Sequence, residues 1–234
     1  SLEGAVNSVI AILQMGVPIA RIELLDDTQI AAVNDYAGLG LPVLPTLWME
    51  FHGSPAAVDE QIEIVEDIAR GNRAATFQYS ETEEDRNKMW KARHDALWAN
   101  KNKCPGLAML PTDVCVPISR LADCILETKA DIESTGLFGP ILGHVGDGNF
   151  HSTIFYDLND PAQRKMAHDL SSRMVKRALA MNGTCTGEHG IGRGKIGYLA
   201  LEHGAAVDVM RSIKAAIDPL NIMNPQKIFE EPAQ

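Results

Sequence analysis

The sequence predicts an α+β protein, with a mostly antiparallel sheet covered by helices and a helical segment at its C-terminal end. Two observations support this. Strand-like alternation of apolar and polar residues is interspersed along the chain with amphipathic helical patterns. In addition, Asp147-Gly148 lies between two apolar runs and is a strong hairpin signal. Because a hairpin joins antiparallel strands, we expect a mixed or antiparallel sheet with helices mainly on one face.

The first half of the chain carries clear signals for where its elements begin. Ser54-Pro55 combines an N-cap with proline at the first helical position. Ser80 and Glu83 form a capping box, which predicts a long helix after them. We therefore expect helices over residues 2–16, 27–36, 54–70 and 80–100, and strands over residues 19–25, 46–51 and 74–79.

The second half repeats this scheme around the hairpin. Pro111 interrupts one strand pattern, and Pro117 is suited to open a helix. We expect a strand over 107–116, a helix over 117–131, the hairpin over 138–156 and a helix over 160–181. A glycine-rich stretch over 183–197 and a helix over 199–217 complete the chain.

Composition excludes several classes of function. The formal net charge of −10 over 234 residues argues against nucleic acid as a partner and against docking on anionic lipid. The longest weakly polar run, residues 6–20, is too short for a transmembrane segment. Four cysteines without a CxxC motif suggest reduced thiols in a cytosol-like compartment. The chain starts at Ser1, within a helical pattern, so we expect it to be part of a longer protein.

The predicted hairpin brings two histidines together. A two-residue type I′ turn at Asp147-Gly148 places His144 directly opposite His151, with Cβ atoms roughly 4.5–5.5 Å apart. Two imidazoles at that spacing can share one metal ion. The alternative is a hairpin with two unrelated histidines. A register shift of one residue would place the two rings on opposite faces.

The glycine-rich stretch contains an adjacent acid and imidazole, Glu188 and His189. It is not a Walker A loop, because His189 stands where glycine is needed and Ile196 where serine or threonine is needed. Its glycine spacing also departs from the dinucleotide-binding fingerprint. Glu188 is a candidate third ligand, since two histidines and a glutamate leave an open position for catalysis. His189 would then act as a base. The alternative is a solvated pair on a surface loop.

Arg93 lies on an otherwise apolar helix face with Met89, Trp90 and Leu97. Such an arginine either extends its charged end to water or meets a buried anion. Its planar guanidinium would suit the carboxylate of a substrate.

Three segments together carry a family resemblance: GHVGDGNFH at 143–151, GTCTGEHGIG at 183–192 and MNPQK at 223–227. In this order they resemble the C-terminal half of FAD-linked oxidases of the vanillyl-alcohol-oxidase type. PTDVCVPISRL at 111–121 is similar to the branch of cytochrome-type D-lactate dehydrogenases and glycolate oxidase flavin subunits. The resemblance implies a ferredoxin-like, substrate-binding cap domain over residues 1–182. It also implies a C-terminal segment, residues 183–234, that completes the flavin and metal site, and an N-terminal FAD-binding domain outside this chain.

The same resemblance assigns roles to individual residues. It implies a divalent metal, Zn or Mn, on His144, His151 and Glu188, with His189 as the general base. It further implies that Arg93 and Asn149 bind the substrate and that Asn224 and Lys227 approach the FAD.

The implied reaction is oxidation of a D-2-hydroxy acid, D-lactate or glycolate, to the 2-oxo acid. The metal would assist deprotonation of the hydroxyl, and hydride would pass to FAD. Pro111 and Thr112 stand where the 2-hydroxyglutarate branch has a lysine, which favours a monocarboxylate. We expect an electron acceptor such as a cytochrome or quinone, and a location in the cytoplasm or peripheral to an inner membrane.

Three further expectations accompany this reading. This chain alone would be inactive, because it lacks the flavin-binding part. A homodimer is compatible with the sequence, since a flavin-facing surface would be exposed. A zinc-dependent hydrolase and a noncatalytic α+β binding module remain as alternatives.

Overall fold

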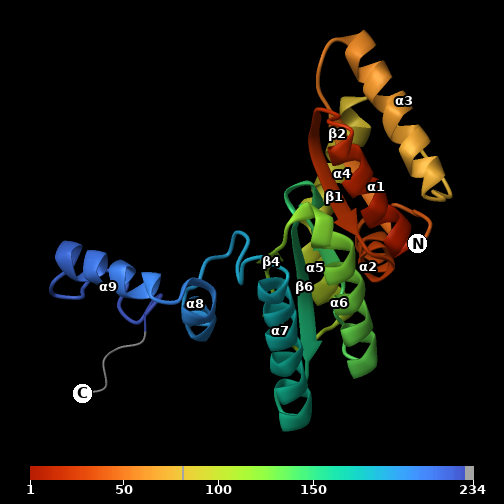
Figure 1. Ribbon diagram of the computed structural model, residues 1–234. Helices are drawn as coiled ribbons and strands as arrows, with labels where there is room; N and C mark the ends of the chain where they lie inside the picture. Colours follow the sequence, from red (N-terminus) through yellow and green to blue (C-terminus); the bar gives the residue numbers. More distant parts are fainter. Residues whose placement is uncertain (81, 230–234) are drawn as a thin grey trace.

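The computed structural model describes residues 1–80 and 82–229 (Figure 1). Its centre is a six-stranded sheet in the order β2-β1-β5-β6-β3, with β4 also paired to β6. All of these strand pairs are antiparallel. The strands are β1 (Ile19–Leu25), β2 (Thr46–Phe51), β3 (Ala108–Pro111), β4 (Val114–Cys115), β5 (Ile141–Gly143) and β6 (Asn149–Tyr156). The predicted α+β class is confirmed.

Helices cover both faces of the sheet. One core contains side chains from α1 (Leu2–Gln14), α3 (Pro55–Gly71), α6 (Leu121–Thr135) and α7 (Pro161–Ala180). A second core contains side chains from α2 (Asp27–Ala37), α4 (Glu83–His94) and α5 (Ala96–Lys103). The expectation that helices lie mainly on one face is therefore wrong. The reason is visible in β1, where Leu24 joins the first core and Leu25 the second, because neighbouring strand residues point to opposite faces.

Side-chain caps set the starts of several helices, and the one at Ser54 was expected. Asp26 accepts a hydrogen bond from the Gln29 N–H at 2.7 Å at the start of α2. Ser54 caps α3, which has Pro55 at its first position. These interactions satisfy backbone N–H groups that have no partner within the helix.

Three expected elements differ in the structure. Residues 74–79 form no strand and most of them are exposed, although Phe77 packs against the first core. The helix expected over 80–100 is interrupted at Asp95, between α4 and α5, and begins with Thr82 as its N-cap. The last helix is divided at Gly204, whose positive φ of 53° ends it.

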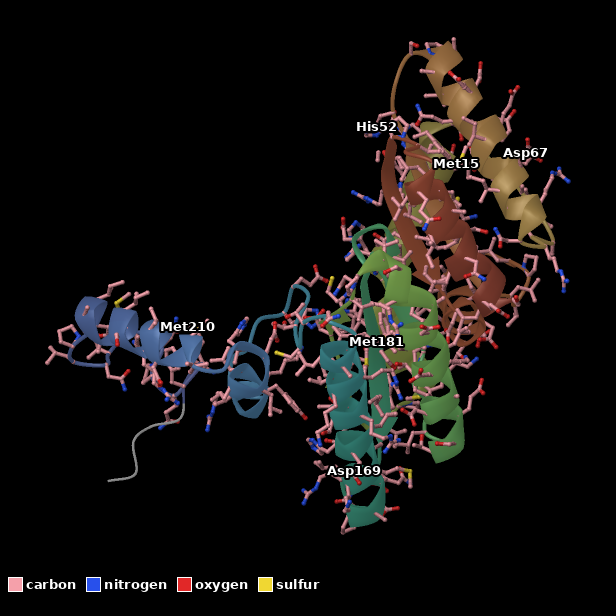
Figure 2. The ribbon with its side chains drawn as sticks, viewed as in Figure 1. Met15, His52, Asp67, Asp169, Met181 and Met210 are labelled. Carbon is pink, nitrogen blue, oxygen red and sulfur yellow. The ribbon has the colours of Figure 1, made fainter. Side chains whose placement is uncertain are left out.

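The last two helices, α8 (Ile196–His203) and α9 (Ala206–Ile217), follow α7 and extend away from the sheet and the helices that cover it (Figure 1). Met181 marks the end of α7 where this departure begins, and Met210 lies on α9 (Figure 2). The division at residues 182 and 183 remains a prediction about domains. Among the described residues, no helix has both the length and the apolar character needed to cross a membrane.

Candidate metal and substrate site

The histidine hairpin forms, but its register differs from the prediction. Leu142, and not His144, is the partner of His151 in the β5–β6 ladder, so the predicted register is wrong by two residues. The connection is longer than a two-residue turn. A 3-10 turn, η2 (Val145–Asp147), follows His144, and only Gly148 takes a positive φ, 78°. A Cβ atom at Gly148 would lie 2.1 Å from the carbonyl oxygen of Val116, so this tight position requires glycine.

The two histidines nevertheless converge. Side chains alternate between faces with a period of two, so a shift of two residues keeps His144 and His151 on the same side. Their ring centroids lie 6.0 Å apart. The two imidazoles therefore lie on the same side, as predicted, although the predicted pairing of His144 with His151 is wrong.

Glu188 approaches both histidines from the glycine-rich stretch. Its Oε1 atom lies 3.0 Å from His151 Nε2 and 3.7 Å from His144 Nε2. One ligand atom from each of the three residues lies within 4.8 Å of the other two. Two imidazole nitrogens and one carboxylate oxygen at this separation suit a divalent metal such as Zn or Mn. The chemistry of this donor set therefore fits the metal that the sequence analysis expects.

The position of Glu188 depends on Asp113, a fully buried residue between β3 and β4. Asp113 Oδ2 accepts hydrogen bonds from the Glu188 N–H at 3.0 Å and the His189 N–H at 2.9 Å. Thr186 Oγ1 donates to the same oxygen at 2.8 Å. Burial raises the pKa of Asp113, but the adjacent His151 ring and hydrogen bonds from the His189 N–H, Asn149 and Thr186 outweigh that effect, so the pKa lies well below its usual range. The ionised carboxylate therefore anchors the glycine-rich stretch to the sheet.

A lysine and a glycine complete this anchor. Lys195 Nζ donates to the backbone carbonyl of Asp113 at 2.6 Å. Burial lowers the pKa of Lys195, and the nearby Asp113 carboxylate opposes that effect only in part. At Gly187, an added Cβ would lie 1.9 Å from Asn149 Nδ2, so the backbone approaches Asn149 more closely than any side chain would allow.

Asn149 is buried, and the two polar atoms of its amide differ in their hydrogen bonding. Nδ2 donates to Asp113 Oδ1 at 2.8 Å and to the Val114 carbonyl at 2.9 Å. Within the described part of the chain, its buried Oδ1 has no hydrogen-bond partner. An unpartnered acceptor of this kind can receive a hydrogen bond from a ligand.

Arg93 does not extend into water. Its Nε and Nη2 atoms both lie 3.0 Å from Oε2 of Glu23, and its side chain is only 15% exposed. The other oxygen of Glu23 lies 2.5 Å from His144 Nδ1. The hydrogen bond with Glu23 raises the pKa of His144 despite its partial burial. Of the two explanations for Arg93, the structure thus shows an arginine that meets a buried anion, and that anion is Glu23.

His189 lies at the edge of the cluster. Its ring stacks on that of His151, with centroids 4.9 Å apart and planes 7° from parallel. Its side chain is half-exposed, and Nε2 lies 3.9 Å from Glu188 Oε1. A second metal-compatible set consists of Asp113, His151 and His189. We favour the first set because the Asp113 oxygens already accept several hydrogen bonds.

The two residues expected near the flavin lie on the tail that follows α9. Asn224 and Lys227 are both exposed, and Asn224 has a positive φ of 46°. The tail returns toward the glycine-rich stretch, since the Ile228 N–H donates to the Gly192 carbonyl at 2.8 Å. Their role toward FAD remains a prediction.

Sequence reasoning missed Glu23, Asp113 and Lys195. Glu23 is a charged residue within a strand pattern, and Asp113 stands alone in an otherwise apolar run. Such an acid inside a strand is a usable signal, because a buried carboxylate requires partners. It does not reveal which partners those are. The four cysteines lie in the described part of the chain and form no disulfide with one another.

Comparisons with known proteins relate this chain to FAD-linked oxidases. A 4-ethylphenol oxidase from Gulosibacter chungangensis, solved as an isoeugenol complex, superposes with a TM-score of 0.68 at 19% identity. The match covers 97% of this chain and 52% of that one, and it supports the fold alone. The family model for FAD linked oxidases, C-terminal domain, matches residues 1–228. The chain therefore belongs to the FAD-linked oxidase family, of which it contains the C-terminal domain.

Two curated relatives are more similar in sequence. A probable mitochondrial D-lactate dehydrogenase from Danio rerio is 52% identical over 98% of this chain and 46% of its own length. A mitochondrial D-lactate dehydrogenase [cytochrome] from Arabidopsis thaliana is 42% identical over 98% of this chain and 41% of its length. The chain thus spans less than half the length of these relatives.

Proposed function

We propose that the full-length protein oxidises a D-2-hydroxy acid to the 2-oxo acid, with FAD as hydride acceptor and a divalent metal in the cluster. D-lactate is the proposed substrate, because both relatives described above are named D-lactate dehydrogenases. The observation that carries the proposal is the convergence of His144 Nε2, His151 Nε2 and Glu188 Oε1, with a fourth functional group, His189, stacked beside them.

Different residues of this chain would bind the metal and accept the substrate proton. His144, His151 and Glu188 would hold the metal and leave part of its coordination shell for substrate. A metal held there would supply a lower pKa for the substrate hydroxyl, and FAD would supply the acceptor for the hydride. His189, held by its stack and its backbone bond to Asp113, takes the hydroxyl proton at Nε2.

Substrate binding falls to two residues. Asn149 Oδ1 is an unpartnered acceptor in the described structure and would bind a polar hydrogen of the substrate. The guanidinium of Arg93 has its Nε and Nη2 directed at Glu23, which leaves Nη1 for the substrate carboxylate. We propose that most FAD contacts come from the part of the relatives that this chain does not span, with Asn224 and Lys227 contributing from the tail.

The names of the relatives also support a partner and a location. One of them is named for a cytochrome, which supports a cytochrome as electron acceptor over a quinone. Both are named mitochondrial, which supports a mitochondrial location over the cytoplasm.

The test is elemental analysis and turnover of the full-length protein. We expect about one equivalent of Zn or Mn, and oxidation of D-lactate faster than of glycolate with an artificial electron acceptor. His144→Ala should lose the metal and the activity but keep its flavin absorbance. His52→Ala is the control, because His52 is another histidine bonded to a glutamate, exposed and at the end of β2 (Figure 2). Full activity in a metal-free protein would contradict the proposal, and hydrolysis without flavin would favour the hydrolase.

A further inference from the structure

The residue behind His144 is Glu23, which occupies the interior of β1 opposite Trp48 of β2. Its side chain is 3% exposed. A carboxylate at such a position is costly unless both oxygens are satisfied, because it has lost its hydration. Glu23 is absent from each motif that the sequence analysis singled out, and its neighbours in the strand are apolar.

The two oxygens of Glu23 serve two different parts of the site. Oε1 lies 2.5 Å from His144 Nδ1, whereas Oε2 accepts a hydrogen bond from Nε of Arg93 and lies 3.0 Å from its Nη2 in an ion pair. The carboxylate is thus a single bridge between a proposed metal ligand and a proposed substrate-binding residue.

The hydrogen bond to His144 has a definite chemical consequence. An ionised carboxylate can only accept, so the proton of the neutral ring must be on Nδ1. The lone pair then lies on Nε2, which is the nitrogen that faces Glu188. This is the tautomer required for binding a metal from the Nε2 side, and a carboxylate behind a ligating histidine also orients the ring.

The second histidine is held differently. His151 Nδ1 lies 3.4 Å from Asp113 Oδ1 and has no hydrogen bond of good geometry within the described residues. The oxygens of Asp113 are occupied mainly by the glycine-rich stretch and Asn149. The two buried carboxylates therefore act on different groups. Asp113 holds the glycine-rich stretch, and Glu23 contacts the ring of His144.

We propose that Glu23 is a positioning residue that fixes the metal-binding tautomer of His144 and, through its other oxygen, holds Arg93 toward the same site. The proposal rests on the proposed function, because it assumes a metal on His144. The Glu23 carboxylate would then link the residue that binds the metal, His144, to the residue that binds the substrate carboxylate, Arg93.

The test uses Glu23→Gln in the full-length protein, with zinc as the probe. The zinc affinity of the chelator-stripped protein is measured by competition with a coloured chelator. We expect Glu23→Gln to bind zinc about 10- to 100-fold more weakly than wild type, as for other partners of ligating histidines. The KM for D-lactate should also rise, because Arg93 loses the charge that holds it.

Asp26→Asn is the matched control. Asp26 is also a fully buried carboxylate paired with a cation, Lys129, and asparagine preserves its N-cap role in α2. A general loss of stability should appear in both variants, whereas weaker zinc binding should appear only in Glu23→Gln. Selective ¹⁵N labelling of histidine adds a signature that a merely structural role would not produce. In the metal-free protein with neutral rings, His144 should be protonated on Nδ1 in wild type, and this preference should weaken in Glu23→Gln.

The outcomes separate the two proposals. If wild type binds zinc, His144→Ala does not, and Glu23→Gln binds as tightly as wild type with His144 unchanged in tautomer, the role of Glu23 is refuted while the metal site stands. If neither wild type nor His144→Ala binds zinc specifically, the metal site of the proposed function is refuted, and the role of Glu23 with it.

Discussion

The imidazole of His189 lies parallel to that of His151, with ring centroids 4.9 Å apart and planes that differ by 7°. A proposed base is thereby fixed against a proposed metal ligand by ring stacking, and its backbone N–H is fixed by Asp113 at 2.9 Å. His189 itself is outside the favoured ligand set. Base and metal functions can therefore be separated by mutation.

His189→Phe should keep the stack and the metal but lose the base. We expect turnover of D-lactate by the full-length protein to fall about 100-fold or more, because general bases typically contribute factors of 10²–10⁴. Metal content, measured by elemental analysis, should remain at the wild-type level. Unchanged turnover would remove His189 from the mechanism, and loss of the metal would instead favour the second donor set.

Gly187→Ala should damage the site by steric conflict alone. The new methyl group would lie 1.9 Å from Asn149 Nδ2, so the glycine-rich stretch must move away from the sheet. We expect a loss of about 2 kcal/mol in the free energy of unfolding, together with weaker metal binding. Urea titration and metal analysis measure the two effects. Gly194→Ala is the control, because nothing lies within 4 Å of its added Cβ, and it should match wild type in both assays.

Lys129→Met should destabilise the fold away from the site. Lys129 is 15% exposed and pairs with the fully buried Asp26 at 2.8 Å. Removing the cation leaves that carboxylate unpaired, so we expect a loss of about 3–5 kcal/mol near neutral pH. Lys165→Met, at an exposed pair with Asp169, should cost only about 0–1 kcal/mol.

The same variant gives a prediction for pH. Burial already raises the pKa of Asp26 above its ordinary value, against the opposing charge of Lys129. A raised pKa means that this group opposes folding as pH rises and that protonation relieves the penalty. Without Lys129 the pKa should rise further. The deficit in unfolding free energy of Lys129→Met should therefore shrink in urea titrations at acidic pH, and an equal deficit at all pH values would contradict this assignment.

Alkylation of the cysteines should follow burial. Burial raises the pKa of Cys124 to about 12 and that of Cys185 to about 12, so almost no reactive thiolate is present at neutral pH. Burial also raises the pKa of Cys104, but this thiol remains partly exposed. Mass spectrometry after iodoacetamide treatment should find Cys104 modified first. Modification of Cys124 or Cys185 in the folded protein, before urea is added, would contradict the buried core.

Several parts of the fold were predictable because their causes are local. The strand over 19–25 follows from alternation, and the start of α3 from Ser54-Pro55. The strand expected over 74–79 was wrong because an apolar pattern does not guarantee a sheet edge to bind. Helices on both faces were missed because Leu24 and Leu25 are equally apolar, and the sequence does not tell which helix packs on each.

The site was predictable to the level of its polar motifs. His144, His151 and Glu188 converge as expected, even though the hairpin register was wrong by two residues. The error did not change the face on which the histidines lie, because a shift of two residues leaves a strand side chain on the same face. Glu23 and Asp113 could not be assigned, because their partners lie far away in sequence: Glu23 is 70 residues from Arg93 and 121 from His144. Only the assembled sheet brings these groups together.

The cluster joins residues from the first strand to the segment that follows the last sheet-packed helix. During synthesis, Glu23 and the two histidines leave the ribosome before Glu188 does, because the carboxylate ligand lies beyond α7. The sheet and its two buried carboxylates can therefore be in place before the third ligand exists. A nascent chain that stops short of Gly187 would carry the two histidines without Glu188, so the proposed metal site could be completed only after this last segment is translated.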